Sequence, residues 1–133
     1  MAYLIDSDIV IDLLSDDPVA LQLLDRLADT GLSISMITYM EVYQGTLVSP
    51  DPHAAQVKLD AFLDGVPIAP ISDGVARRCA LLRTQLQQEG KRVRSRALDL
   101  LIAATALEHG LTLVTHNLDD YGDIPELSLY TSS

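Results

Sequence analysis

Residues 3–8 read Tyr3-Leu4-Ile5-Asp6-Ser7-Asp8, a short apolar run that ends in a polar, acidic turn. Four similar runs follow along the chain, so we expect β-strands over residues 3–5, 32–35, 66–69, 111–114 and 127–130. Segments with helical spacing predict helices over residues 9–14, 18–29, 37–47, 52–63, 74–89 and 98–109. This alternation favours an α/β fold with a largely parallel sheet, because parallel strands need crossover connections and helices supply them.

The size and composition of the chain are those of a single compact domain. It has 133 residues, 48% of them hydrophobic, and neither a repeat nor a linker divides it, so we expect one domain over residues 1–133. Charged residues interrupt every apolar run before it reaches transmembrane length, and residues 1–10 lack the pattern of a signal peptide. The one cysteine, Cys79, cannot form an internal disulfide. We therefore expect a soluble, cytoplasmic protein without membrane contact.

The charge of the chain is unevenly distributed. A net charge of -10 seems unsuited to nucleic-acid binding, because contacts to phosphates dominate that kind of affinity. However, seven of the nine basic residues fall between positions 77 and 96: Arg77, Arg78, Arg83, Lys91, Arg92, Arg94 and Arg96. This cluster is either a solvated helix face with a loop or a strip that contacts phosphates.

Asp6 directly follows the first predicted strand, which places it at the carboxyl edge of the sheet. Ligands bind at that edge in open α/β sheets. The alternative is that Asp6 only caps the helix that begins near Ile9.

Two more acids lie in apolar surroundings. Glu41 lies in a helix whose other faces are apolar or aromatic, and Asp99 begins the apolar helix over residues 98–109. An isolated, buried carboxylate costs several kcal/mol unless it is paired or bound to a metal. The alternatives are a surface position for Glu41 and, for Asp99, a first-turn acid that complements the helix dipole.

A fourth polar segment follows the fourth predicted strand. Thr115 and Asn117 are placed to hydrogen-bond a carboxylate or a metal-bound water. Asp119 and Asp120 are more typical of caps for a following short helix.

Several acids in one pocket raise one another's pKa, so a divalent cation that neutralises them favours such a cluster. Oxygen ligands suit Mg²⁺, and Mn²⁺ is able to substitute for it. The histidines, His53, His109 and His116, have no neighbour at zinc-ligand spacing. The chain also lacks a glycine-rich phosphate loop and a Gly-x-Ser-x-Gly elbow. The residues therefore indicate a magnesium site.

The chain resembles the PIN-domain ribonucleases, and in particular the VapC toxins of type II toxin–antitoxin pairs. The resemblance covers nearly the whole chain and rests on four segments in order: residues 3–8, 37–45, 99–106 and 113–121. It implies a three-layer PIN-like fold with a five-stranded, mostly parallel sheet of order 3-2-1-4-5, flanked by helices. Strands one and four would then lie side by side, with Asp6 on one side of a crevice and Thr115 and Asn117 on the other.

The resemblance also implies the activity and the site residues. Asp6 and Asp99 would hold Mg²⁺, directly or through water, in an endoribonuclease in which Glu41 helps to deprotonate the attacking water. The fourth catalytic position falls on Asn117 or on the nearby Asp119 and Asp120. The residues expected to bind the RNA substrate are Thr115, Arg92, Arg94 and Arg96. The implied partners are a cognate VapB-like antitoxin and a second copy of the chain in a homodimer.

One departure from the family pattern and two alternatives remain. Asp8 stands where the first motif usually has asparagine, which adds a negative charge. Asp6 and Asp8 also resemble the opening motif of haloacid-dehalogenase-type phosphatases. That family requires a later lysine after a strand, and neither Lys58 nor Lys91 follows a predicted strand. The other alternative is a non-catalytic, PIN-like binding module, against which the intact Asp6, Glu41 and Asp99 argue.

Overall fold

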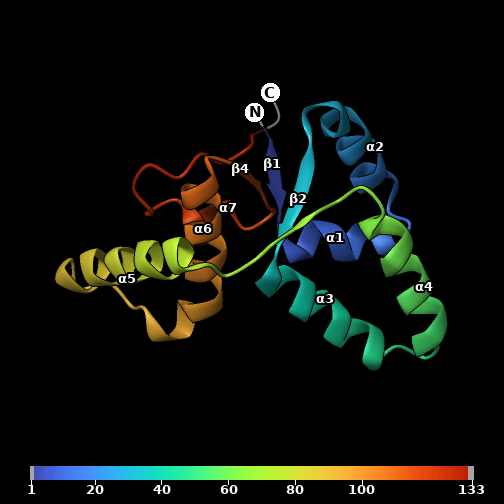
Figure 1. Cartoon of the computed structure of the whole chain (residues 1–133), viewed down its shortest axis with the longest axis horizontal. Coiled ribbons are helices and arrows are strands. Elements are labelled where there is room, and N and C mark those ends of the chain that lie inside the picture. The colour runs from blue at the N-terminus through green and yellow to red at the C-terminus, as the bar shows by residue number, and fades with distance from the viewer. Residues whose placement is uncertain (1, 132–133) are drawn as a thin grey trace.

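The computed structural model describes residues 2–131. A parallel sheet lies between two layers of helices (Figure 1). Its strands are β1 (Tyr3–Ile5), β2 (Leu32–Ser35), β3 (Ile68–Ala69) and β4 (Thr112–Val114), in the order β3-β2-β1-β4. The expected α/β class and three-layer arrangement are confirmed.

The six predicted helices are all present, and each of their ends lies within two residues of the expected position. They are α1 (Ser7–Leu14), α2 (Pro18–Leu27), α3 (Met36–Leu47), α4 (Pro52–Leu63), α5 (Asp73–Gln88) and α6 (Ala97–His109). The structure adds the short helix α7 (Leu118–Tyr121) and the 3₁₀ turns η1 (Ala28–Thr30) and η2 (Arg94–Arg96). None of the helices within residues 2–131 has the length and apolar character needed to cross a membrane.

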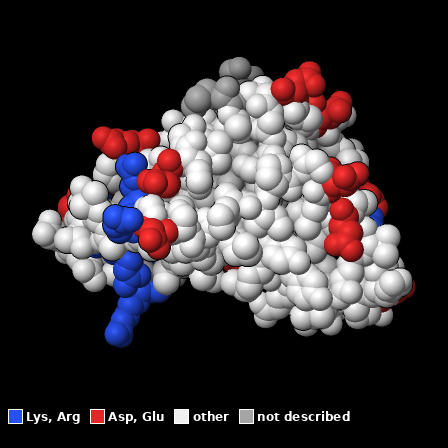
Figure 2. Space-filling model, viewed as in Figure 1, with Lys and Arg blue, Asp and Glu red and all other residues white. Residues whose placement is uncertain are grey.

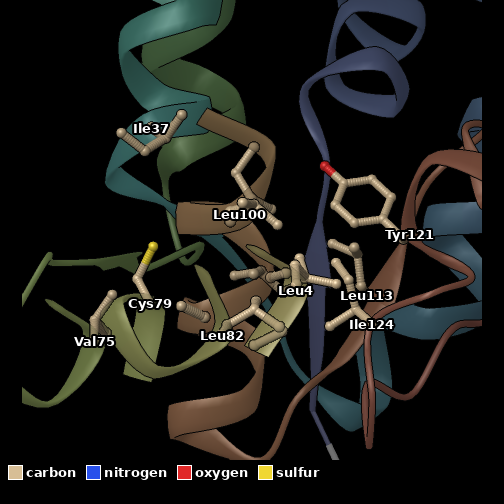
Figure 3. Packing of buried hydrophobic residues seen from close by; sticks show 14 of the residues in the cluster. Leu4, Ile37, Val75, Cys79, Leu82, Leu100, Leu113, Tyr121 and Ile124 are labelled. Atoms are coloured by element: carbon tan, nitrogen blue, oxygen red, sulfur yellow. The ribbon is translucent and has the colours of Figure 1, made fainter. Parts of the chain in front are cut away.

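Both faces of the sheet are buried. Leu4 and Leu113 pack with side chains of α5, α6 and α7 on one face, as Figure 3 shows. Their neighbours Ile5 and Val114 pack with side chains of α1, α2, α3 and α4 on the other face. Successive side chains of a strand point to opposite faces, so consecutive apolar residues of β1 and β4 serve both cores. Polar residues, Asp6 and Thr115, follow directly where the two strands end, and both are buried.

The prediction of a fifth strand over residues 127–130 is wrong, but this segment does lie beside β4 as expected. It is reduced to a single parallel bridge between Leu113 and Leu129, beside β4. The Leu113 N–H donates to the Ser128 carbonyl at 2.9 Å, and the Tyr130 N–H donates to the Leu113 carbonyl at 2.9 Å. Glu126, with φ 66°, turns the chain three residues before Leu129, which leaves little extended chain beside β4.

Candidate active site

The site lies where β1 and β4 end side by side. Tyr3, Leu4 and Ile5 pair with Thr112, Leu113 and Val114 in sequence. The Asp6 N–H extends this ladder by donating to the Val114 carbonyl at 2.9 Å. Asp6 is therefore next to Thr115 at the carboxyl edge, where the strand order reverses. This confirms the expected position of Asp6 and Thr115 at the switch point of the sheet.

Asp6 has partners on both of its carboxylate oxygens, and its side chain is buried. Oδ1 accepts a hydrogen bond from the Ser7 N–H at 2.8 Å, where α1 begins. Oδ2 accepts one from the Thr115 hydroxyl at 2.8 Å and lies 3.2 Å from the Tyr121 hydroxyl. Asp6 therefore caps the helix and also belongs to the site, so the two interpretations of the sequence are compatible.

The Tyr121 hydroxyl joins Asp6 to Asp99. Asp99 lies in the first turn of α6, and its Oδ1 is 3.3 Å from the same hydroxyl. Sequence reasoning did not name Tyr121 as a site residue. A signal was present, because a tyrosine at an apolar helix position needs a hydrogen-bond partner when it is buried, and Tyr121 follows directly on the acidic pair Asp119 and Asp120.

Glu41 contributes an oxygen without a partner. Helix α3 begins immediately after β2, with the Ser35 hydroxyl accepting a hydrogen bond from the Thr38 N–H at 3.0 Å. Glu41 lies on this helix, near enough to the site that, besides the effect of burial, a hydrogen bond from the Ser7 side chain lowers its pKa and the charges of Asp99 and Asp8 raise it. Its Oε1 atom is buried and has no hydrogen-bond partner among residues 2–131. A buried polar atom left unpaired costs about 1–3 kcal/mol. An oxygen of this kind suits a cation or a water bound to one.

Asp8 lies inside the acidic cluster. Its Oδ2 accepts a hydrogen bond from the His116 N–H at 3.0 Å and is 3.3 Å from the Thr115 hydroxyl. Its Oδ1 accepts one from the Ile9 N–H at 2.7 Å. The charge that departs from the family pattern therefore adds to the negative potential of the site.

The electrostatics of the site favour proton or cation binding. Burial raises the pKa of Asp6 to about 6, while the Thr115 hydroxyl opposes the rise and the charge of Asp8 adds to it. Burial also raises the pKa of Asp99 and of Glu41, with a further contribution from Asp8 in both cases. Without a cation, burial and the neighbouring negative charges make these acids harder to ionise.

The fourth corner of the site differs from expectation. Asn117 is exposed, and within residues 2–131 its side chain makes no hydrogen bond to the acids; its backbone N–H donates to the Thr115 hydroxyl at 3.0 Å. Asp119 and Asp120 are exposed in the first turn of α7. Asp120 still acts on the site, because its charge raises the pKa of Asp99. The structure therefore does not bring the Asn117 side chain to the acids.

The three arginines expected to bind RNA divide into two groups. Arg92 and Arg94 are exposed. They belong to the basic strip, the name used here for the seven basic residues between positions 77 and 96. Figure 2 shows Lys and Arg side chains gathered on one side of the molecule, with acids beside them. Arg96 instead makes a bidentate ion pair with Asp123 at 2.7 and 2.9 Å and donates to the Asp120 carbonyl at 2.8 Å. Arg96 was also expected to bind RNA, but the ion pair to Asp123 and the bond to the Asp120 carbonyl occupy its guanidinium fork.

The donor set fits a hydrated cation better than a fully protein-bound one. No three histidine, cysteine, aspartate or glutamate side chains in the described part of the chain lie close enough to hold a metal ion by themselves. Mg²⁺ usually keeps several waters and takes one or two carboxylates. Asp6, Asp99 and the unpaired Glu41 oxygen meet that requirement, and their all-oxygen chemistry does not suit zinc.

The phosphatase alternative lacks its lysine. Lys58 donates to Asp16 at 2.8 Å and to the Leu14 carbonyl at 2.9 Å. Lys91 forms ion pairs with Glu89 and Asp123. Both lysines are engaged elsewhere, so neither places its ammonium group to steady a phosphate on Asp6.

A parallel sheet enclosed by helices, with acids gathered at its switch point, defines the class as a PIN domain. The family described as PIN domain matches residues 3–126. The chain therefore belongs to the PIN-domain family, and within it to the VapC group.

The relatives support this assignment over the full length of the chain. Ribonuclease VapC2 of Rickettsia felis is 32% identical over 133 residues, which cover 97% of this chain and 96% of that protein. Ribonuclease VapC4 of Mycobacterium tuberculosis is 31% identical over 109 residues, which cover 80% of this chain and 82% of that protein. A chain of the VapBC2 complex of Rickettsia felis, crystallised with a promoter DNA fragment, superposes with a TM-score of 0.89 at 30% identity, with all of both chains covered. The resemblance inferred from the four sequence segments is confirmed.

Proposed function

We propose that this protein is a Mg²⁺-dependent endoribonuclease and the toxin of a VapBC-type toxin–antitoxin pair, acting in the cytoplasm. Its relatives are named as VapC ribonucleases, and a similar fold occurs in VapBC complexes. One observation carries the metal-dependent part of the proposal. Two linked acids, Asp6 and Asp99, lie at the switch point together with a buried Glu41 oxygen that has no partner among residues 2–131.

The acids divide the chemistry between them. Asp6 and Asp99 hold the cation, and Thr115 keeps Asp6 oriented through the hydrogen bond to Oδ2. When bound, Mg²⁺ or Mn²⁺ supplies positive charge that stabilises the phosphate and the departing oxygen. Glu41 accepts the proton of the attacking water, a role that its raised pKa favours because it makes the carboxylate a stronger base. Water attacks phosphorus and the bond to the 3′ oxygen breaks, which gives a 5′ phosphate and a 3′ oxygen that takes a proton from solvent.

The basic strip supplies contacts to RNA. Arg92 and Arg94 are exposed, and they follow the end of α5 in the segment that leads to η2 and α6, the helix that carries Asp99. Contacts from arginine to phosphate position the strand without reading its sequence.

The partners follow from the relatives and from the surface. The acids of the site attract a basic side chain of a VapB-like antitoxin. A second copy of the chain would cover the exposed apolar residues of α3, which are Met36, Met40 and Tyr43. The alternative of a non-catalytic binding module would need no cation at the acids.

Replacing Asp6 tests the proposed activity. Asp6→Asn removes the charge and keeps the size of the side chain, so we expect Mg²⁺-dependent RNA cleavage to fall by at least about 10²-fold while the fold persists. RNA cleavage with and without EDTA measures the first effect, and circular dichroism measures the second. The matched control is Asp25→Asn, an exposed position on α2. Full activity in Asp6→Asn, or unchanged wild-type cleavage in EDTA, contradicts the proposal.

A further inference from the structure

Tyr121 has an unusual position for a polar side chain. It is 1% exposed, and its ring packs beside Leu113 and Ile124 in the core (Figure 3). In the same view its hydroxyl oxygen is directed toward the junction of β1 and α1, where Asp6 lies. The ring is therefore a core residue, while its hydroxyl belongs to the acidic site.

The hydroxyl connects two acids that come from distant parts of the chain. It lies 3.2 Å from Asp6 Oδ2 and 3.3 Å from Asp99 Oδ1. Within residues 2–131, no other side chain hydrogen-bonds both acids. A phenol has one proton and donates it to one carboxylate at a time. The two acids thus share a single donor, which reduces their repulsion and keeps them near each other.

The segment that carries Tyr121 is held from outside the site. Arg96 donates to the Asp120 carbonyl at 2.8 Å, one residue before the tyrosine. It also forms the bidentate pair with Asp123, two residues after it, and Lys91 adds an ion pair to the same carboxylate at 3.4 Å. The buried ring and the contacts to Asp120 and Asp123 therefore hold the hydroxyl between Asp6 and Asp99.

We propose that Tyr121 is a positioning residue for the cation site. Its hydroxyl holds Asp6 and Asp99 at a separation from which both reach one hydrated cation, and each carboxylate keeps free lone pairs for that cation. The bidentate pair of Arg96 with Asp123 holds the segment that carries Tyr121. This inference rests on the proposed metal-dependent function and adds a residue to its machinery.

Calorimetry with Mn²⁺ on the full chain tests the inference through Tyr121→Phe. The phenylalanine keeps the ring in the core and removes only the bridging oxygen. We expect Mn²⁺ to bind about 10–100-fold more weakly, the usual effect of losing a group that orients a metal ligand. RNA cleavage should need a correspondingly higher Mg²⁺ concentration and recover when Mg²⁺ is saturating. The control is Tyr130→Phe, whose ring packs on Tyr3 at the opposite end of β1 from Asp6.

A second variant covers the case in which Tyr121→Phe does not fold. Asp123→Asn keeps the hydroxyl and weakens the ion pairs that hold its segment, so we expect a smaller loss of Mn²⁺ affinity in the same direction. A purely structural role for Tyr121 would lower the thermal unfolding midpoint without changing Mn²⁺ affinity.

The outcomes separate the inference from the proposed function. If wild type binds Mn²⁺ and the folded variants, Tyr121→Phe or Asp123→Asn, bind it equally well, the positioning role is overturned and the metal site stands. If wild type binds no Mn²⁺, or Asp6→Asn binds it unchanged, the proposed metal-dependent function fails and the inference fails with it.

Discussion

At the scale of single residues, the site uses positions that also have ordinary structural roles. Asp6 accepts a hydrogen bond from the first N–H of α1, and Asp99 lies in the first turn of α6, where an acid complements the helix dipole. Neither role explains why the two acids share the Tyr121 hydroxyl, or why a buried Glu41 oxygen has no partner among residues 2–131. The site is recognised by these additional contacts.

The raised pKa of Asp6 predicts how stability depends on pH in the cation-free protein. Its folded-state pKa is about 6 against an ordinary value of 3.8, so between these values the native state binds more protons than the unfolded state. The free energy of unfolding therefore falls as pH rises through about 6, by up to about 3 kcal/mol for this group. About 1.4 kcal/mol of this fall lies between about pH 5 and about pH 8, and denaturant unfolding in EDTA at these two pH values measures it.

Asp6→Asn is the control for this dependence, because the neutral amide has no charge to bury. Relative to wild type, the variant should gain stability as pH rises, and saturating Mg²⁺ should remove most of that gain. A stability difference that stays constant across the pH range contradicts the assignment of the effect to Asp6.

At the scale of elements, local signals place the helices well and the strands less well. Asp17 and Asp51 cap helices that begin with proline, and the starts of α2 and α4 match the expected positions. The expected strand over residues 66–69 shortens to β3, and the expected fifth strand shortens to one bridge. A helix satisfies its own backbone, whereas the length of a strand depends on the neighbour that pairs with it.

The end of α6 provides a test at this scale. Gly110 follows the helix with φ 64°, in the left-handed region, and no atom lies within 4 Å of the position that a Cβ would take. Gly110→Ala should therefore lower the free energy of unfolding by about 1–2 kcal/mol through backbone strain alone. The comparison is Gly45→Ala inside α3, also in open space, which should raise it by about 0.5–1 kcal/mol. Urea unfolding of both variants measures these changes. A loss of stability in Gly45→Ala as well as in Gly110→Ala would contradict the explanation by backbone conformation.

At the scale of the whole molecule, the net charge of -10 conceals an organised surface. Acids occupy the switch point, and the basic strip lies on the side of α5 (Figure 2). In the proposed function, RNA would approach an acidic site on a molecule that also carries a basic surface, and a cation at the acids would remove part of the repulsion.

The basic strip predicts the salt dependence of RNA binding. In an Asp6→Asn background, where the RNA stays intact, Arg92→Ala and Arg94→Ala should each weaken binding and reduce the slope of log affinity against log salt by about 0.7–1. Lys58→Gln on α4 is the control, since that lysine pairs with Asp16 and lies outside the strip. Fluorescence anisotropy with a single-stranded RNA over a range of salt concentrations measures both effects. Equal slopes in all three variants would assign RNA contact to another surface.

The sequence alone determined the order of helices, the α/β class and the three acids, because these depend on local periodicity and on residue types out of place in apolar surroundings. Only the tertiary structure determined which groups are in contact. The Tyr121 hydroxyl contacts Asp6, 115 positions away in sequence, and Arg96 pairs with Asp123, whereas the Asn117 side chain lies apart from the acids. Local patterns report whether a residue is buried. Only the packing of distant segments determines the direction of its side chain, because hydrogen bonds form within about 3 Å and depend on angle.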